Sequence, residues 1–115
     1  MNHMSVYLKN KVLTENFIDT PTYVGLYNGD EEVAATSYER QPVSFNAATD
    51  GQITNSKDVL FPIAKETWGA ITHVGLFDAT SNGNQLFKAP AEYVKNIDVS
   101  SQYKIPDHYL IVRVR

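Results

Sequence analysis

The N-terminal part of the chain has the apolar spacing of an amphipathic helix. Over about residues 5–16, apolar side chains recur four positions apart, which places them on one helical face. Ser5 stands just before this pattern and is a suitable N-cap residue. Residues 19–21 end it, because the residue before Pro21 is driven out of helical backbone angles. The apolar pairs are Leu8 with Val12 and Leu13 with Phe17.

From residue 22 onward, short runs of β-branched and aromatic residues alternate with turn residues, a pattern that predicts strands. The Asn28-Gly29-Asp30 sequence predicts a tight turn. Pro42 removes one backbone donor, so its strand is expected at a sheet edge or a bulge. Residues 46–54 lack helical periodicity and carry a glycine after an aspartate, which predicts a loop. The predicted strands are 22–27, 38–45, 59–61, 71–77, 85–88, 93–99 and 109–114.

Many short strands behind one helix favour a mainly β fold. We expect an antiparallel β-sandwich or open barrel, with one N-terminal α-helix packed on one face or end. The 115 residues fit a single domain, 1–115, with a helix at about 5–16 and a β-rich part at about 22–115. The chain has no cysteine, so its stability must come from packing.

One internal repeat gives a more specific expectation. The sequence Thr-Tyr-Val-Gly-Leu-Tyr-Asn of residues 22–28 recurs as Thr-His-Val-Gly-Leu-Phe-Asp at 72–78. Each copy predicts a strand with one interior glycine, Gly25 or Gly75. Glycine weakens a strand unless something lies close above it, so we interpret both as points of close packing where two sheets cross, in preference to a ligand site.

Charge and hydropathy exclude two classes of partner. Ten basic and thirteen acidic residues give a net charge of −3, which offers no general attraction for phosphate backbones. We therefore expect no nucleic-acid partner. The start of the chain lacks the regions of a signal peptide, and nowhere do about 18 apolar residues run together, so we expect no membrane partner.

The residue types that usually act as catalytic groups or metal ligands are scattered along the sequence. His3, His73 and His108 form no zinc-binding pair, and His73 is interpreted as an aromatic equivalent of Tyr23 in the repeat. No nucleophile elbow, phosphate loop or dinucleotide-binding glycine pattern occurs. The sequence therefore predicts no catalytic residue, no cofactor and no enzyme activity.

The nearest approach to a metal motif begins at Asp78. Residues 78–84 place oxygen-bearing side chains at alternate positions with glycine sixth, as in the first half of a calcium loop. Ala89 stands where the bidentate glutamate would be, and the flanks predict strands instead of helices. We interpret the segment as a hairpin turn and predict no metal site.

The N-terminal helix, residues 23–27, residues 38–45 and residues 68–79, taken in this order, resemble a family of small virion structural proteins of tailed bacteriophages, of the tail fibre or minor structural type. The run from Trp68 to Ala79 is the most specific part. Residues 103–107 depart from the family pattern, which commonly has a glycine-containing turn there. The structural signature comprises Trp68, Gly69, Gly25, Gly75 and Asp78.

The resemblance implies a non-enzymatic virion component, assembled in the host cytoplasm, with other virion proteins as partners and a tendency to form a homo-oligomer. A tail, baseplate or fibre-associated protein is the leading hypothesis, and a capsid decoration protein is the alternative. Tyr38 and Arg40 are candidate interface residues, since Tyr and Arg are enriched at contact hot spots. Arg40 could equally pair with a surface carboxylate.

A carbohydrate-binding β-sandwich is a weaker alternative, from a different functional class. Such a protein would use exposed tyrosines and Trp68 as stacking platforms for host glycans. The two hypotheses differ in the position of Trp68, because a buried indole beside Gly69 is not available to a sugar.

Overall fold

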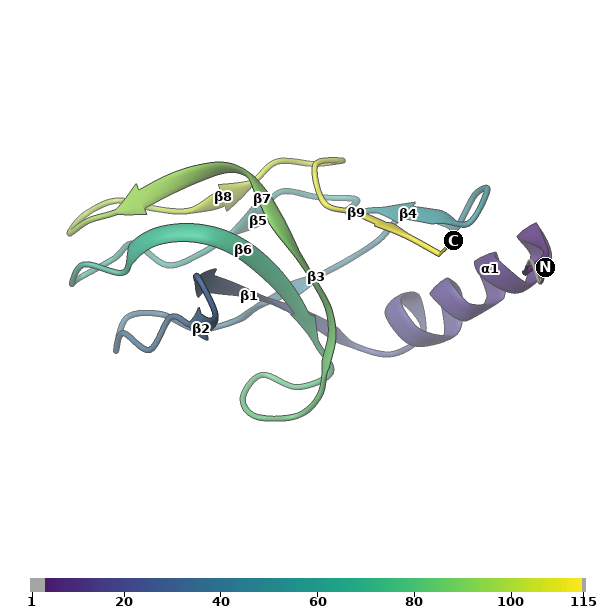
Figure 1. The fold of residues 1–115 in the computed structure, drawn as a ribbon, viewed down its shortest axis with the longest axis horizontal. Helices are drawn as coiled ribbons and strands as arrows, with labels where there is room; N and C mark the ends of the chain where they lie inside the picture. The colour runs from purple at the N-terminus through teal and green to yellow at the C-terminus, as the bar shows by residue number, and fades with distance from the viewer. Residues whose placement is uncertain (1–3, 115) are drawn as a thin grey trace.

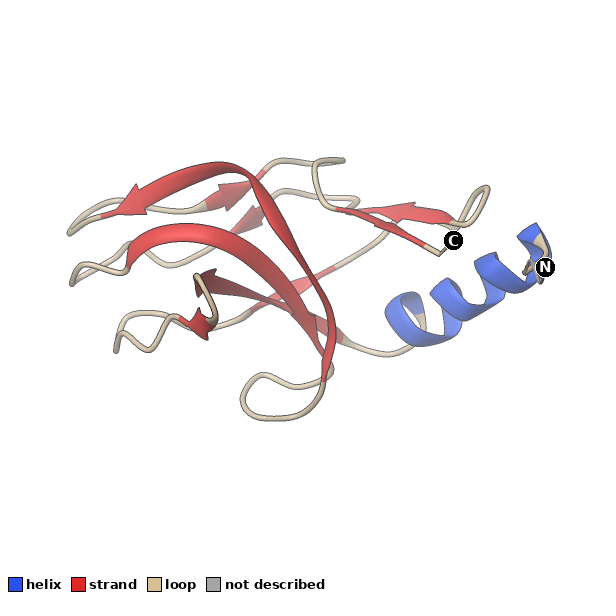
Figure 2. Cartoon of the chain, in the orientation of Figure 1, coloured by secondary structure: helices blue, strands red, loops and turns tan. Residues whose placement is uncertain are grey.

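The N-terminal helix forms as predicted. The computed structural model describes residues 4–114, and its first element, α1 (Val6–Leu13), continues directly into a π-helical segment, η1 (Thr14–Ile18) (Figures 1 and 2). The Ser5 hydroxyl caps the helix by accepting a hydrogen bond from the Leu8 amide at 3.1 Å. Within residues 4–114, no helix has the length and apolar character needed to cross a membrane.

The helical segment is anchored by apolar side chains in its second half and by Asn10, whose side chain accepts a hydrogen bond from the Gly51 amide at 2.8 Å. Leu13 is fully buried, and Phe17 and Ile18 pack against the core. The first turns extend beyond the β-rich part at one end of the elongated molecule, which measures 47 × 26 × 24 Å (Figure 1).

The largest sheet is antiparallel and has β1 at its centre. Its strand order is β2-β1-β6-β7, and β3 pairs with the part of β1 that β2 leaves free. The strands are β1 (Thr22–Asn28), β2 (Glu31–Glu32), β3 (Gln41–Val43), β6 (Gly69–Phe77) and β7 (Gln85–Ile97). Gly29 and Asp30 form the tight turn between β1 and β2, as predicted. Pro42 lies in β3, which pairs only with β1, so the predicted edge position is confirmed.

The predicted strands at 85–88 and 93–99 are wrong in one respect, because they form a single strand, β7. Pro90 lies in the middle of β7 and interrupts the sequence pattern. It is tolerated because β7 is the last strand of its sheet and pairs with β6 alone. The register shifts between Ile71 and His73, next to the His73–Pro90 pair, which absorbs the irregularity.

The pairing of four short strands into two small sheets was not predicted. One pairs β4 (Gln52–Thr54) with β9 (Ile111–Arg113), and the other pairs β5 (Val59–Leu60) with β8 (Lys104–Ile105). The predicted loop over 46–54 is therefore wrong at its end, residues 52–54. β5 and β9 lie within the predicted strands 59–61 and 109–114, whereas β4 and β8 were missed because they have two or three residues each and partners far away in sequence.

The two small sheets pack against one face of the large sheet. Buried side chains from all three sheets and from α1 form a single apolar cluster. The architecture is thus mainly β, antiparallel and sandwich-like, with one N-terminal helix and no closed barrel in the described part of the chain, which confirms the predicted fold class. The cluster comprises Leu13, Val24, Leu26, Val33, Ile53, Val59, Phe61, Ala64, Trp68, Ile71, Val74, Leu76, Ile97, Tyr103, Ile105, Leu110 and Val112.

Trp68 is part of this core, with only 5% of its surface exposed. Its ring packs edge-to-face on Tyr38 at a centroid distance of 5.5 Å. The indole Nε1 donates a hydrogen bond to the Ser37 hydroxyl at 3.0 Å, so its polar atom is satisfied. The indole is not available as an exposed stacking platform, which removes the main residue of the carbohydrate-binding hypothesis.

We predict that Trp68→Ala lowers the free energy of unfolding by about 3–5 kcal/mol, the usual range for deletion of a buried large aromatic ring. Urea unfolding followed by circular dichroism measures this change. Val99→Ala is the control, because Val99 is 58% exposed. We expect the control to change stability by less than about 0.5 kcal/mol. A Trp68→Ala loss as small as that of the control would contradict the core position.

Candidate functional site: a cation and aromatic stack over paired glycines

The two copies of the internal repeat pair with each other. β1 and β6 are antiparallel neighbours, and the register sets Gly25 directly opposite Gly75. The repeat therefore has a local two-fold relation centred on the glycine pair. Tyr27 and Phe77, which occupy equivalent positions in the two copies, lie on the same face as the glycines, because side chains alternate along a strand.

Each glycine is covered by an aromatic ring that a side chain in its place would displace. A Cβ atom at Gly25 would lie 2.7 Å from Cε1 of Phe77, and one at Gly75 would lie 2.9 Å from Cε1 of Tyr27. Both distances are too short for carbon atoms. The expected close packing is present, but its expected cause, a crossing of two sheets, was wrong. The covering groups are rings on adjacent strands of one sheet, and within residues 4–114 no second sheet crosses at the glycines.

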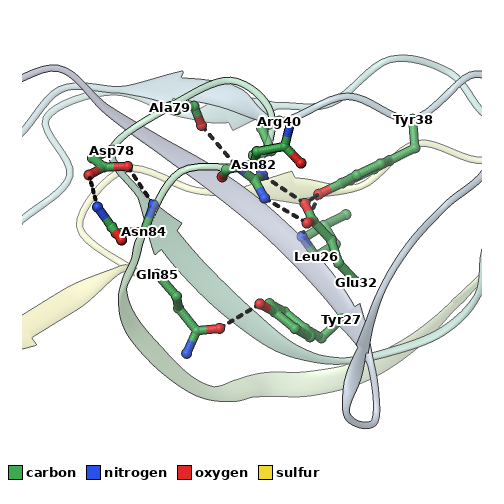
Figure 3. Close-up of polar contacts among 10 residues, drawn as sticks. All are labelled: Leu26, Tyr27, Glu32, Tyr38, Arg40, Asp78, Ala79, Asn82, Asn84 and Gln85. Atoms are coloured by element: carbon green, nitrogen blue, oxygen red, sulfur yellow. Dashed lines mark hydrogen bonds and ion pairs between the residues drawn. The ribbon is translucent and has the colours of Figure 1, made fainter.

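Two cations extend the pair of rings into a stack of four groups. The rings of Tyr27 and Phe77 are 6.2 Å apart between centroids and inclined by 12°. The Arg40 guanidinium carbon lies 3.6 Å from the centroid of Phe77, and the Lys88 ammonium nitrogen lies 4.2 Å from that of Tyr27. The Tyr27 hydroxyl also donates a hydrogen bond to Gln85 (Figure 3). This stack covers the face of the sheet opposite the apolar core.

Arg40 makes four hydrogen bonds within the chain through its guanidinium group. Its Nε and Nη2 donate to the two carboxylate oxygens of Glu32 at 2.9 and 2.8 Å, in a bidentate pair. Its Nη1 donates to the carbonyl oxygens of Ala79 and Asn82 at 2.9 and 2.8 Å (Figure 3). Only 8% of the Arg40 side chain is exposed, so this residue ties the β1–β2 hairpin to the loop between β6 and β7.

Tyr38 connects this layer to the core by closing a gap at the edge of β1. β2 and β3 leave the Leu26 amide without a strand partner, and that amide donates to the Tyr38 hydroxyl at 3.0 Å. The same hydroxyl donates to Glu32 at 2.6 Å. The Tyr38 ring lies on the core side, where it stacks parallel to Phe61 and meets Trp68 edge-on.

The electrostatics of this network favour a charged Glu32. Partial burial alone would raise the pKa of the Glu32 carboxyl, but the hydrogen bonds from Arg40 and Tyr38 outweigh it and hold that pKa below its usual value. Burial, together with the hydrogen bond to the Glu32 carboxylate, raises the pKa of the Tyr38 hydroxyl far above its usual value. Tyr38 therefore stays protonated and remains a donor to Glu32.

The loop between β6 and β7 is a hairpin turn closed by Asp78. The Asp78 carboxylate accepts hydrogen bonds from the backbone amide and the side-chain amide of Asn84 at 2.7 and 3.0 Å. These bonds, the backbone one first, hold the pKa of Asp78 below its usual value. Asn82 and Gly83 have positive φ angles of 56° and 69°, a conformation that both residue types tolerate. The carboxylate oxygens are thus used to close the loop.

The other residues selected from the sequence lie outside this stack. Gly69 has a φ of 87°, and a Cβ there would lie 2.5 Å from the Asn28 side chain, so the position requires glycine.

His73 is partly buried opposite Tyr27, as its interpretation as an aromatic equivalent requires, and its Nδ1 lies 2.8 Å from the Thr72 hydroxyl. His108 lies next to Asp107 and Asn46, far along the chain from His73. His3 lies outside the described residues.

The structure brings together more residues than the sequence indicated. Gly25, Gly75, Tyr38 and Arg40 meet in one cluster, Asp78 joins it through its loop, and Trp68 joins it through the Tyr38 ring. Sequence reasoning missed the other members. A usable signal existed only for two of them, since the repeat keeps an aromatic residue at 27 and 77. The missed residues are Glu32, Tyr27, Phe77 and Lys88.

The cluster has the properties of a structural junction. Its donors and acceptors bond each other, and among the described residues no buried side-chain nitrogen or oxygen lacks a partner. Within residues 4–114, no group of three or more His, Cys, Asp or Glu side chains is placed to hold a metal ion. The class that this fold and site define is a mainly β, sandwich-like protein whose outer face is held together by one cation and aromatic network.

Comparison with known families agrees with that class. The family model described as Podophage GP4 fiber I protein gp80 matches residues 3–113. The chain therefore belongs to this family of phage fibre structural proteins, and the family implies a virion component. The resemblance to tail-fibre-type virion proteins seen in the sequence is thereby confirmed. A search of curated proteins gave no match.

We predict that Gly75→Val lowers the free energy of unfolding by about 1–3 kcal/mol, because the new side chain overlaps the Tyr27 and Phe77 rings. On an open strand surface the same change would be mildly favourable, since valine has the higher strand propensity. Gly29→Asn is a matched control, because a Cβ there meets nothing within 4 Å and asparagine tolerates its φ of 64°. A neutral or stabilising Gly75→Val would refute the packing of the rings over the glycines.

A second prediction concerns the dependence of stability on pH. Glu32→Gln should lower stability at pH 7 by about 1–3 kcal/mol, because Arg40 and Tyr38 lose a charged acceptor. The folded-state pKa of Glu32 is depressed, so its contribution is present above its unfolded pKa of about 4.3 and is lost as the pH falls through the folded value. The difference from wild type should therefore shrink below about pH 4.

Urea unfolding at a series of pH values between 7 and 3 tests this, with the exposed Glu39→Gln as control. A wild-type minus variant difference that stays constant over the whole range would show that the ionised carboxylate of Glu32 does not stabilise the fold.

A third prediction is that chelation of divalent metal ions leaves the melting temperature unchanged, because the Asp78 oxygens are already bonded to Asn84. A ligand that binds only the folded state raises its stability by mass action. Thermal unfolding in EDTA and in excess calcium measures this. A rise of several degrees in calcium that is absent in Asp78→Asn would overturn the assignment of residues 78–84 as a plain hairpin turn.

Proposed function

We propose that this protein is a non-enzymatic structural subunit of a phage tail, baseplate or fibre, and that it acts through contacts with other virion proteins and with copies of itself. The family supports the virion role. Virion parts work through repeated protein contacts, which need a rigid domain and exposed apolar anchors more than a catalytic group.

The observation that carries this proposal is the distribution of exposed apolar side chains. Tyr7 on α1 is 75% exposed, and Tyr93 on β7 and Tyr109 before β9 are 74% and 57% exposed. Tyrosines are enriched in interfaces because they provide a large rigid contact area with a polar tip. The candidate interface residues Tyr38 and Arg40 make their polar contacts inside the chain, so the exposed tyrosines are the stronger candidates.

Quantitative mass spectrometry of purified particles tests this proposal. We expect peptides of the chain in intact particles, and in the tail fraction after the capsids are dissociated. Absence from intact particles would overturn the proposal. Recovery only with the capsid shell, at a copy number that scales with the major capsid protein, would replace it with capsid decoration.

A genetic test then links this role to the exposed surface. In a phage that lacks this protein, wild-type chain supplied in the host should be incorporated, and Tyr7→Ser should be incorporated at least tenfold less. The control is Val99→Ser, which changes a residue of similar exposure, 58%, on another part of the surface. Equal incorporation of both variants would contradict contacts through α1.

A further inference from the structure

The chain contains two Asn-Gly dipeptides, and both lie in connections between neighbouring strands. Asn28-Gly29 begins the turn between β1 and β2, and Asn82-Gly83 lies in the loop between β6 and β7. Asparagine deamidates spontaneously most readily before glycine, because glycine has no side chain to hinder the approach of its amide nitrogen to the asparagine side chain. The two sites share this chemistry but differ in their hydrogen bonding.

At the first site, the Gly29 amide that would act as the nucleophile is engaged. It donates a hydrogen bond to the Thr72 hydroxyl at 2.8 Å. Asn28 pairs with Glu31 across the hairpin, and Gly29 and Asp30 form the tight turn between them. Rotation of the 28–29 peptide toward the Asn28 side chain would break the bond to Thr72 and the end of the strand pairing, so the fold protects this site.

At the second site, the Gly83 amide is available. Within residues 4–114 it donates no hydrogen bond to another group. Asn82 and Gly83 are exposed and take part in no strand pairing. The Asn82 carbonyl oxygen accepts one hydrogen bond, from Arg40 Nη1 at 2.8 Å (Figure 3). Rotation of the 82–83 peptide breaks that single bond, because Asp78 and Asn84 close the base of the loop separately.

The loop itself requires the reactive dipeptide. Gly83 has a φ of 69°, and a Cβ there would lie 2.5 Å from Oδ1 of Asp78, so no other residue type fits. Asn82 has a φ of 56°, which asparagine tolerates better than most residues. The way in which the loop turns therefore places Asn directly before Gly at an exposed tip.

We propose that Asn82 is a self-modification site, at which the folded chain slowly converts asparagine into an acidic residue without an enzyme. The Gly83 amide nitrogen loses its proton to a solvent base and attacks Cγ of Asn82. The N–Cγ bond forms and the Cγ–Nδ2 bond breaks, and Nδ2 takes a proton from water and leaves as ammonia. The product is a cyclic succinimide that links residues 82 and 83.

Water then opens the succinimide at one of its two carbonyl carbons, and nothing is oxidised or reduced. Attack at Cγ gives aspartate with the original backbone. Attack at the former backbone carbonyl carbon of residue 82 gives isoaspartate, in which the chain runs through Cγ and the α-carboxylate is free. This carboxylate contains the oxygen to which Arg40 donates in the unmodified chain. The isoaspartyl product therefore places a negative charge at a contact that ties the loop to the β1–β2 hairpin.

Ageing of the purified, folded protein at mildly alkaline pH tests the site. Mass spectrometry of tryptic peptides measures the fraction of acid at residues 28 and 82, and labelling by protein isoaspartate methyltransferase measures isoaspartate. We expect the modified fraction at 82 to be at least tenfold higher than at 28, and the labelling to be absent in Asn82→Gln. A fraction at 28 equal to or above that at 82 would overturn the proposal.

The unfolded chain is the matched control for sequence effects. Concentrated urea removes the hydrogen bonds that distinguish the two sites, so both asparagines should then react at similar rates. A tenfold preference for 82 that persists in urea would show that neighbouring residues select the site and that the fold does not. Full protection of 82 in the folded chain, over a time in which the unfolded chain is converted at both sites, would also overturn the proposal.

Thr72→Val tests the protection assigned to the first site, because valine keeps the shape of threonine and lacks the hydroxyl that accepts from Gly29. We expect the rate at Asn28 to rise at least threefold and the rate at Asn82 to stay unchanged, with a melting curve to establish that the variant folds. An unchanged rate at Asn28 would contradict the role of the engaged amide. None of these measurements requires virus particles, so their outcome is independent of the proposed function.

Discussion

Two glycines facing each other across a pair of strands are the constraint on which the outer layer of this protein depends. Because Gly25 and Gly75 lack Cβ atoms, the rings of Tyr27 and Phe77 can lie down over the backbone and stack on each other. With side chains at the two positions, the rings would have to stand away from the sheet. Arg40 would then lose the ring face over which it lies.

Arg40 turns this local arrangement into a junction between distant segments. Its guanidinium contacts the Glu32 carboxylate, the Phe77 ring and two carbonyl oxygens of the loop between β6 and β7. Lysine could not replace it, because an ammonium group lacks the planar fork that serves both partners at once. Tyr38 continues the connection through the edge of β1 into the core, so the two faces of the sheet are held by one set of contacts.

The sequence predicted the features that have local signals. The Ser5 cap, the Gly29 turn, the edge position of Pro42 and the paired importance of Gly25 and Gly75 follow from neighbouring residues. The repeat also predicted two equivalent strands, although not that they would be neighbours. The resemblance carried by residues 68–79 led to the correct family.

What the sequence did not predict depends on long-range pairing. β4 is defined by a partner about sixty residues away and β8 by one about forty-five residues away, and β7 continues through Pro90 only because its outer edge is unpaired. The carboxylate that pairs with Arg40 could not be predicted either, because Asp30, Glu31 and Glu32 form one acidic run. Side chains alternate along β2, and this alternation turns Glu32 toward the guanidinium. The strand pairing and the partner of Arg40 are therefore determined by the tertiary structure.

The most direct test of the glycine constraint is to introduce Gly75→Ala in the wild-type chain and in Tyr27→Leu, and to compare the two changes in the free energy of unfolding. With the Tyr27 ring in place, the new Cβ lies 2.9 Å from Cε1, and the substitution should be destabilising by about 1–3 kcal/mol. With leucine at 27 the shortest contact of this Cβ is removed and the 3.2 Å approach to Cε1 of Phe77 remains, so alanine should cost at least about 1 kcal/mol less than it does in the wild-type chain. An equal loss in both backgrounds would contradict the account.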